Sequence, residues 1–300
     1  MSDGAASREW TTRSERGALP LIRMMVWVAL RLGRPVARLL LYPVCVYYLC
    51  FNGAARHASR DYLRRVLPNP PGPADFFRHF HHFAACVLDR VFLLTAQVHL
   101  FDIRVTGEEI VLDMVKRRTG CILLGAHFGS FEVARTLGRR QADLRISLVM
   151  YEENARKIRT VLTAIDPQLA RDVIALGVSD SMITVGERLE RGDVVGILAD
   201  RSIAGEATAR YSFFGSTASF PQGAFRLAIL MGRPVVLMIG AYRGGRRYDV
   251  VFETLIDPAH PLPGGRGEQV DGAMRRYVER LEHYCREAPF NWFNFYDFWA

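Results

Sequence analysis

The last two thirds of the chain hold seven short apolar runs, rich in Val, Ile and Leu, with segments of helical spacing between most of them. Runs that are apolar at nearly every position indicate strands covered on both faces, and helices between strands indicate parallel connections. The last two runs are joined through RGGRR, which leaves no room for a helix and predicts an antiparallel hairpin. The pattern therefore predicts an α/β fold with a mixed, mainly parallel sheet flanked by helices. The expected strands cover residues 101–107, 121–126, 144–150, 172–176, 193–200, 234–242 and 247–255.

The N-terminal region has a different pattern, a strongly apolar stretch at 19–51 that arginines and prolines interrupt. Its longest uncharged run, 39–51, has thirteen residues, whereas a helix that crosses a membrane needs about 20. We expect two amphipathic helices, near 20–33 and 35–50, that lie in the membrane interface while their arginines reach the lipid headgroups. A buried N-terminal helical hairpin is the alternative. The interrupting residues are Arg23, Arg31, Arg34, Pro35, Arg38 and Pro43.

The sequence between these two regions predicts a boundary between an N-terminal segment and a separate α/β domain. Residues 58–67 have helical spacing, and PNPPGP at 68–73 ends it with the clearest Pro/Gly cluster in the chain. Residues 74–101 then place apolar side chains at steps of three and four, the spacing of a long amphipathic helix. We therefore expect an N-terminal membrane-associating segment at 1–67, a linker at 68–73 and an α/β domain at 74–300.

The charge distribution indicates which class of partner the protein binds, and the cysteines indicate its redox compartment. The net charge is +8, and residues 1–60 contribute +6 of it through nine arginines and three acidic residues. A basic segment suits nucleic-acid phosphates or an anionic membrane surface, but the apolar residues between these arginines favour membrane lipids, so we expect no nucleic-acid partner. The five cysteines include no CxxC pair, which favours a reducing compartment over a disulfide framework or a zinc site.

Three histidines on the expected long helix, His79, His81 and His82, raise the question of a metal site. Only His79 and His82 share a helical face, and no carboxylate stands beside them at ligand spacing. We therefore predict that this cluster lies on a solvated face and that the protein holds no metal.

The stretch CILLGAHFGSFEVART, at 121–136, carries the strongest candidate chemistry. His127 follows an expected strand, and functional groups gather at the carboxyl ends of strands in open α/β sheets. Glu132 falls in the first turn of the expected next helix. There its carboxylate can hydrogen-bond one imidazole nitrogen and leave the other free as a general base. The alternative is that both residues are structural: His127 is a hydrogen-bonded histidine at a strand end, and Glu132 stabilises the helix because a negative charge is favourable at a helix N-terminus.

Small residues around this pair indicate how a substrate would bind. Gly125 and Gly129 would let a substrate carbonyl approach the backbone closely, and the helix that Ser130 is expected to cap offers N–H groups to a developing oxyanion. The sequence contains no G-x-S-x-G, H-E-x-x-H or G-x-x-x-x-G-K-[ST] motif. Serine hydrolase, zincin and P-loop chemistries therefore lack their central residues.

The spacing His-x4-Glu in HFGSFE resembles the signature of the lysophospholipid acyltransferase superfamily, and specifically its bacterial lipid A biosynthesis (lauroyl/myristoyl) acyltransferase branch. LADRS at 198–202, the stretch at 213–236 and the C-terminal PFNWFNFYDFW resemble the same branch, in the same order. The resemblance runs from about Trp10 to Trp299.

The resemblance implies an enzyme on the cytoplasmic face of the bacterial inner membrane, peripheral or monotopic, that moves a fatty acyl chain from a thioester to a hydroxyl of a lipid-like acceptor. The thioester would be acyl-acyl carrier protein or acyl-CoA, a co-substrate, and no cofactor is implied. His127 takes the general-base position and Glu132 that of the orienting carboxylate, so 74–300 becomes the acyltransferase domain. The acceptor, the chain length and the oligomeric state stay open.

Further substrate contacts follow from the same resemblance. Asn154 and Arg159 are candidates for contact with a phosphate, and Asp200 is followed by Arg201 where many lipid A members have Asp-Gln-Asp. Because 121–126 and 193–200 are expected as strands of one sheet, Asp200 and Arg201 should lie at the same edge as His127. Arg201 would then pair with a phosphate or carboxylate of a substrate, and a structural Asp200–Arg201 cap is the alternative.

The aromatic C-terminal segment, 289–299, leaves two possibilities open. It offers surface for acyl chains or a membrane interface, or it docks onto the core as a terminal segment. A non-catalytic lipid-binding protein that keeps the fold is the alternative to an enzyme, and the presence of both His127 and Glu132 favours the enzyme.

Overall fold

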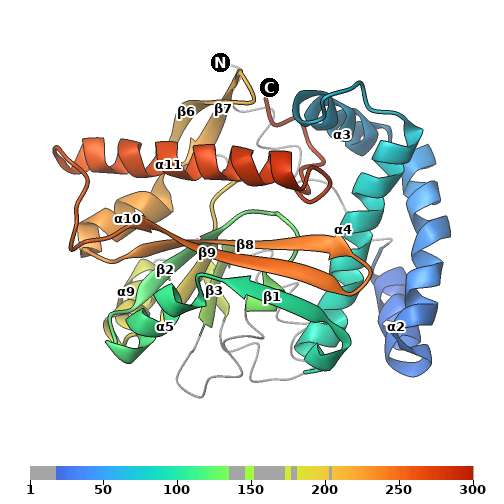
Figure 1. The fold of residues 1–300 in the computed structure, drawn as a ribbon, viewed down its shortest axis with the longest axis horizontal. Coiled ribbons are helices and arrows are strands. Elements are labelled where there is room, and N and C mark those ends of the chain that lie inside the picture. The colour runs from blue at the N-terminus through green and yellow to red at the C-terminus, as the bar shows by residue number, and fades with distance from the viewer. Residues whose placement is uncertain (1–17, 135–145, 152–172, 177–180, 203–204, 300) are drawn as a thin grey trace.

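A computed structural model describes residues 18–134, 146–151, 173–176, 181–202 and 205–299 (Figure 1). All seven expected strands are present and form one sheet, which confirms the predicted fold class. The strands are β1 (Asp102–Thr106), β2 (Cys121–Gly125), β3 (Ile146–Tyr151), β4 (Val173–Leu176), β5 (Val194–Leu198), β8 (Val235–Gly244) and β9 (Arg247–Ile256). The helices are α2 (Ala18–Phe51), α3 (Gly53–Val66), α4 (Pro73–Leu94), α5 (Glu108–Lys116), α9 (Ser181–Glu190), α10 (Gly223–Met231) and α11 (Arg266–Glu287), with a short 3₁₀ helix at Val98–Leu100.

The sheet has the order β1-β9-β8-β2-β5-β3-β4. Its central strands β8, β2, β5 and β3 pair in parallel, and β8 and β9 form the expected antiparallel hairpin. Since β1 pairs in parallel with β9, these two strands run against the other five. The carboxyl ends of β2 and β5 therefore meet at one edge, which is where the candidate site forms.

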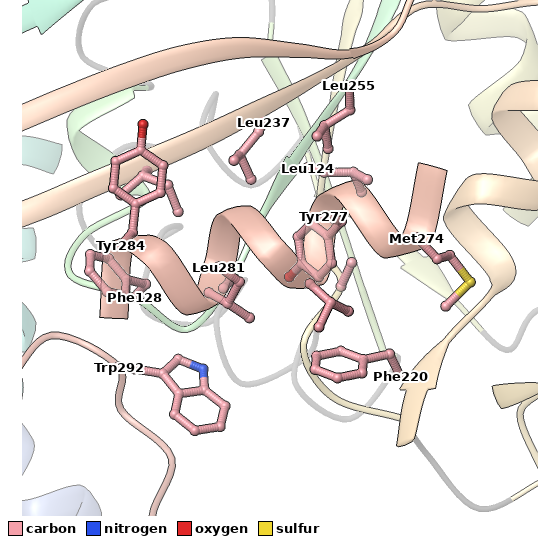
Figure 2. Packing of buried hydrophobic residues seen from close by; sticks show 14 of the residues in the cluster. Leu124, Phe128, Phe220, Leu237, Leu255, Met274, Tyr277, Leu281, Tyr284 and Trp292 are labelled. Carbon is pink, nitrogen blue, oxygen red and sulfur yellow. The ribbon is translucent and has the colours of Figure 1, made fainter. Parts of the chain in front are cut away.

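Successive side chains of each strand point to opposite sides of the sheet, and both sides are buried in hydrophobic cores. On β2, Ile122 and Leu124 join the hydrophobic core beneath α11, whereas Cys121 and Leu123 join the core on the opposite face. Figure 2 shows Leu124 and Leu237 of the sheet opposite Tyr277 of α11. The near-continuous apolar strands read from the sequence thus correspond to a sheet with helices on both sides.

A second, two-stranded sheet was not expected from the sequence. It consists of β6 (Thr208–Phe213) and β7 (Ser216–Pro221), which pair antiparallel. Its strands alternate polar and apolar residues, so they lack the apolar runs that marked the main sheet. The turn places Phe214 and Gly215 at φ values of 53° and 74°, and a two-residue turn with both angles positive matches the twist of a hairpin. Phe213 and Phe220 carry its apolar face into the core under α11.

The N-terminal apolar stretch forms the two predicted helical pieces, which meet at Gly33 with φ 82° and ψ 169°. Pro35 follows this break, and α2 packs along α4, as Figure 1 shows. The PNPPGP stretch connects α3 to α4, and its last residue, Pro73, is the first residue of α4. Among the described helices, none is by itself long and apolar enough to cross a membrane. Trp27–Phe51 of α2 and α3, which meet at a bend of 94°, reach the required length and apolar composition only when they are taken as a pair.

The arginines of α2 are expected to reach lipid headgroups, but two of them point into the protein instead. Arg34 is 8% exposed and donates two hydrogen bonds, of 2.7 and 2.9 Å, to the fully buried carboxylate of Asp89 on α4. Arg38 lies 3.7 Å from the same carboxylate and donates to the hydroxyl of Tyr242. Burying a carboxylate is unfavourable without a charged partner. These arginines therefore fix α2 against α4 and β8.

The opposite side of α2, here called its outer face, is apolar and exposed. Such a large exposed apolar patch is unusual for a helix on a water-facing surface. The exposed side chains are Trp27, Leu30, Leu32, Val36, Leu39, Leu40, Val46, Tyr47, Tyr48 and Phe51.

Candidate active site

The register of two strands brings His127 and Asp200 together. In the parallel pair β2–β5, Gly125 lies opposite Leu198, and the N–H of Ala199 extends the ladder by donating to the carbonyl of Gly125. His127 comes two residues after Gly125, and Asp200 comes two residues after Leu198. Both side chains therefore stand just past the same sheet edge, as the sequence predicts.

The two residues are in direct contact. Nδ1 of His127 lies 2.8 Å from Oδ1 of Asp200, and the backbone N–H of His127 donates to Oδ2 at 3.0 Å. An ionised carboxylate only accepts hydrogen bonds, so Nδ1 carries the proton and Nε2 holds a lone pair. The His127 side chain is 34% exposed, and no side chain in the described part of the protein hydrogen-bonds to Nε2. This nitrogen can accept a proton from a bound molecule.

The electrostatic surroundings keep the imidazole neutral and the carboxylate charged. Burial and the positive charge of Arg201 lower the pKa of His127 below its usual 6.5, against the opposite effect of Asp200. Burial on its own would raise the pKa of Asp200, but the charge of His127 in its protonated form, the hydrogen bonds from His127 and the charge of Arg201 outweigh it and lower the pKa to about 2. At neutral pH the pair is therefore a neutral base held by an ionised carboxylate.

The aromatic C-terminal segment docks onto the core and covers this pair. Trp292 is fully buried, with Phe293 and Phe298 nearly so, and Figure 2 shows Trp292 beside Phe128 and below α11. The indole N–H of Trp292 donates to Oδ2 of Asp200 at 3.0 Å, and the N–H of Phe293 donates to the carbonyl of His127 at 2.7 Å. The side chain of Asn291 fixes the segment by bonding both the N–H and the carbonyl of Tyr242.

Arg201 also contacts this segment. Its guanidinium donates to the carbonyl of Phe293 at 2.7 Å and lies 5.5 Å from the centre of the Tyr296 ring. The structure thus places Arg201 at the predicted sheet edge, next to His127 and Asp200. Its pairing with a substrate anion stays a prediction.

Glu132 is buried in the first helical residues after the His127 loop, at 6% exposure. The sequence predicts that Glu132 hydrogen-bonds one imidazole nitrogen of His127, whereas the carboxylate that bonds the imidazole, at Nδ1, belongs to Asp200. An oxygen of Glu132 lies 3.8 Å from Nε of Arg90 on α4. Glu132 is the carboxylate nearest to His127 in the sequence, but the parallel pairing of β2 and β5 brings Asp200 into contact with the imidazole.

The small residues around His127 serve close packing. A Cβ at Gly129 would collide with the carbonyl oxygen of Gly240, and one at Gly125 would come within 3.0 Å of the Phe131 ring. The N–H of Gly129 donates to the carbonyl of Asn291, and the N–H of Ser130 to that of Gly240. These two N–H groups are therefore already used within the protein. That the first N–H groups of the helix after Ser130 face an oxyanion stays a prediction.

A family model supplies the context for this geometry. The model described as bacterial lipid A biosynthesis acyltransferase matches residues 16–300. The chain belongs to this family. A search among curated proteins gave no match. Since the match runs through every residue of the site, the His127–Asp200 pair lies within the acyltransferase fold of this family.

The histidine cluster of α4 in this acyltransferase does not lie on a solvated face as predicted, because His79 is fully buried. Its Nδ1 bonds to the hydroxyl of Ser59 and its Nε2 to the carbonyl of Trp292, each at 2.8 Å. Within the described ranges no group of three or more His, Cys, Asp or Glu side chains is arranged to hold a metal ion. The sequence pattern could not reveal the burial of His79, since its partners come from α3 and the C-terminal segment.

Two predicted substrate contacts of the acyltransferase, Asn154 and Arg159, lie outside the described residues. Sequence reasoning missed Trp292, whose contact with Asp200 has no local signature. The only sequence signal at this position is the density of aromatic residues in 289–299.

Proposed function

We propose that this protein transfers a fatty acyl group from a thioester to a hydroxyl of a lipid-like acceptor at a membrane surface, with His127 as the general base. The observation that carries the proposal is the hydrogen bond between Nδ1 of His127 and Asp200, which leaves Nε2 as a proton acceptor at the edge of the sheet. Family membership supports acyl transfer as the reaction class.

The reaction needs few groups. Nε2 of His127 takes the proton of the acceptor hydroxyl as its oxygen attacks the thioester carbonyl, and the C–O bond forms. The tetrahedral intermediate collapses, the C–S bond breaks, and the thiolate receives the proton from Nε2. Asp200 stabilises the imidazolium during this cycle because its carboxylate stays ionised. An ester and a free thiol result, and His127 returns to its starting state.

The donor and the acceptor are proposed by chemical class. Acyl carrier protein and coenzyme A present the acyl chain on the same pantetheine thioester, so the chemistry at His127 is shared. Arg201 is proposed to attract a phosphate or carboxylate of either substrate, since its charge already acts on His127. The acceptor contributes a hydroxyl, as a lipid A precursor, a lysophospholipid or a related lipid would.

The outer face of α2 supports the membrane location. Each large apolar side chain transferred from water into a lipid environment gains about 1.5–3 kcal/mol, and the inner side of α2 is already held by the Arg34–Asp89 pair. We propose peripheral or monotopic binding to the cytoplasmic face of the bacterial inner membrane, where acyl thioesters are made available.

Acyl transfer to membrane lipids tests this function directly. Full-length protein in detergent or vesicles is incubated with radiolabelled acyl-acyl carrier protein or acyl-CoA and a lipid extract, and labelled products are identified by mass spectrometry. His127→Ala should lower turnover by about two to four orders of magnitude. His260→Ala is the matched control, because the His260 side chain is 85% exposed on a loop and pairs with the nearby Asp257. Normal turnover by His127→Ala would contradict the mechanism, and no transfer from either donor by the unmodified protein would favour a lipid-binding role.

A further inference from the structure

The carboxylate of Asp200 has a second side-chain donor besides His127. Its Oδ2 accepts the indole N–H of Trp292 at 3.0 Å, in addition to the backbone N–H of His127. Asp200 and Trp292 are both fully buried. The indole N–H is therefore one of the donors that satisfy this buried carboxylate, for which an unmade hydrogen bond would be costly.

Trp292 is itself held by the N-terminal helices. Its carbonyl accepts a hydrogen bond from Nε2 of His79, so His79 carries its proton there and its Nδ1 accepts the hydroxyl of Ser59. Burial lowers the pKa of His79 to about 4, which keeps this ring neutral. The ring of Tyr62 on α3 stacks edge-on against the indole at 5.0 Å. A continuous set of hydrogen bonds thus runs from α3 through α4 and the C-terminal segment to Asp200.

We propose that Trp292 is a positioning residue for the His127–Asp200 pair, and that Ser59 and His79 fix its place. The inference rests on the proposed role of His127 as general base. With its Oδ2 held by the indole, the carboxylate cannot rotate, and Oδ1 stays directed at Nδ1 of His127. The N-terminal helices then contribute to catalysis through the C-terminal segment as well as to membrane binding.

The indole N–H also has an electrostatic effect on His127. By donating to Oδ2 it offsets part of the negative charge of Asp200, and that charge is what favours the imidazolium. Removing the donor makes the carboxylate attract the proton on His127 more strongly, so the pKa of His127 should rise. In the described part of the chain, the other charged or titratable groups that interact with the pair are Arg90, Arg201, Tyr277, Cys285 and Tyr296, and a substitution at Trp292 leaves them in place.

Two variants and one control test the inference in the full-length protein. Trp292→Phe removes the N–H and keeps an aromatic ring. Because the smaller ring can admit a water molecule as a substitute donor, a second variant carries 3-benzothienylalanine at 292, in which sulfur replaces N–H and the bicyclic shape is kept. Trp299→Phe is the control, since Trp299 belongs to the same aromatic cluster but its N–H donates to the carbonyl of Phe213.

Two measurements are made on each variant after thermal unfolding has shown that it folds. One is the pH dependence of kcat/KM, and the other is the NMR titration of His127 in protein labelled with ¹³C at histidine Cε1, assigned with His127→Gln. Both Trp292 variants should lose about ten- to a hundredfold in kcat/KM, the effect of removing a hydrogen bond to a charged group. In both, the titration of His127 should move to higher pH, and Trp299→Phe should change neither quantity.

An unchanged titration in the folded benzothienylalanine variant, or an equal shift in Trp299→Phe, would overturn the inference. The benzothienylalanine variant decides the question alone if Trp292→Phe does not fold. The failure of the proposed function looks different: His127→Gln would then keep its activity, whereas the NMR titration would still report whether Trp292 acts on the pair.

Discussion

Nδ1 of His127 lies 2.8 Å from Oδ1 of Asp200, although 73 residues separate the two in the chain. The contact exists because β2 and β5 are parallel neighbours in register, and each residue stands two positions beyond its strand. It fixes the tautomer of the imidazole and keeps Nε2 as a proton acceptor. The chemistry of the site therefore depends on strand pairing more than on the His-x4-Glu spacing.

Asp200 should matter more to turnover than Glu132. Asp200→Asn keeps the shape but removes the charge, and its amide can donate to Nδ1, which would place the proton of His127 on Nε2. We expect kcat to fall by about two to four orders of magnitude. Glu132→Gln, which changes a carboxylate near Arg90, should cause a smaller loss. Steady-state kinetics of both variants checks the order, and a larger effect of Glu132→Gln would contradict the assignment.

The pH profile should show that His127 works as a neutral base. Because the pKa of His127 is lowered, the neutral form persists below pH 6.5, so kcat/KM should stay level through neutral pH and fall only on further acidification. Arg201→Gln removes a positive charge that disfavours the imidazolium, so the pKa should rise and the acid limb should move to higher pH.

Arg191→Gln is the matched control for this charge, because Arg191, just after α9, is exposed and pairs with the exposed Glu187 of that helix. It should leave the profile unchanged. An acid limb in Arg201→Gln that stays in place, or moves to lower pH, would contradict the electrostatic role of Arg201.

The outer face of α2 should carry the protein to membranes. Leu39→Glu combined with Tyr47→Glu places two charges on this face, where the side chains are 69% and 60% exposed. Flotation with vesicles of phosphatidylethanolamine and phosphatidylglycerol should recover the unmodified protein, also at high salt, because apolar burial is not screened. The double variant should remain unbound. Ile183→Glu, on an apolar residue of α9 that is 63% exposed, is the control, and an equal loss there would contradict a specific role of α2.

The Arg34–Asp89 pair should stabilise the attachment of α2. Arg34→Met leaves a fully buried carboxylate without its two-pronged partner, and we expect the free energy of unfolding to fall by about 3–5 kcal/mol. Adding Asp89→Asn should recover part of this loss, since the unpaired charge is removed. Thermal unfolding of the two single variants and the double variant in detergent measures the coupling. Additive losses would show that the pair contributes little.

The sequence by itself determined the features that depend on local pattern. The seven apolar runs became strands because residues such as Ile122 and Leu123 are buried whichever face they point to. The break in the N-terminal helix falls at Gly33, where a positive φ and the following Pro35 end regular helix geometry. The position of His127 after β2 followed from the same pattern, because a polar residue ends an apolar run there. The alternating, less apolar β6–β7 hairpin gave no such signal.

Only the tertiary structure decided which polar groups pair. Asp200 rather than Glu132 reaches His127 because strand register, not sequence distance, brings side chains together. Arg34 turns to Asp89 and His79 to Trp292 because buried polar groups must find partners, and those partners lie on other elements. A one-dimensional pattern specifies which face of a helix is apolar, but the group that meets each polar side chain depends on how the helices, the sheet and the C-terminal segment pack.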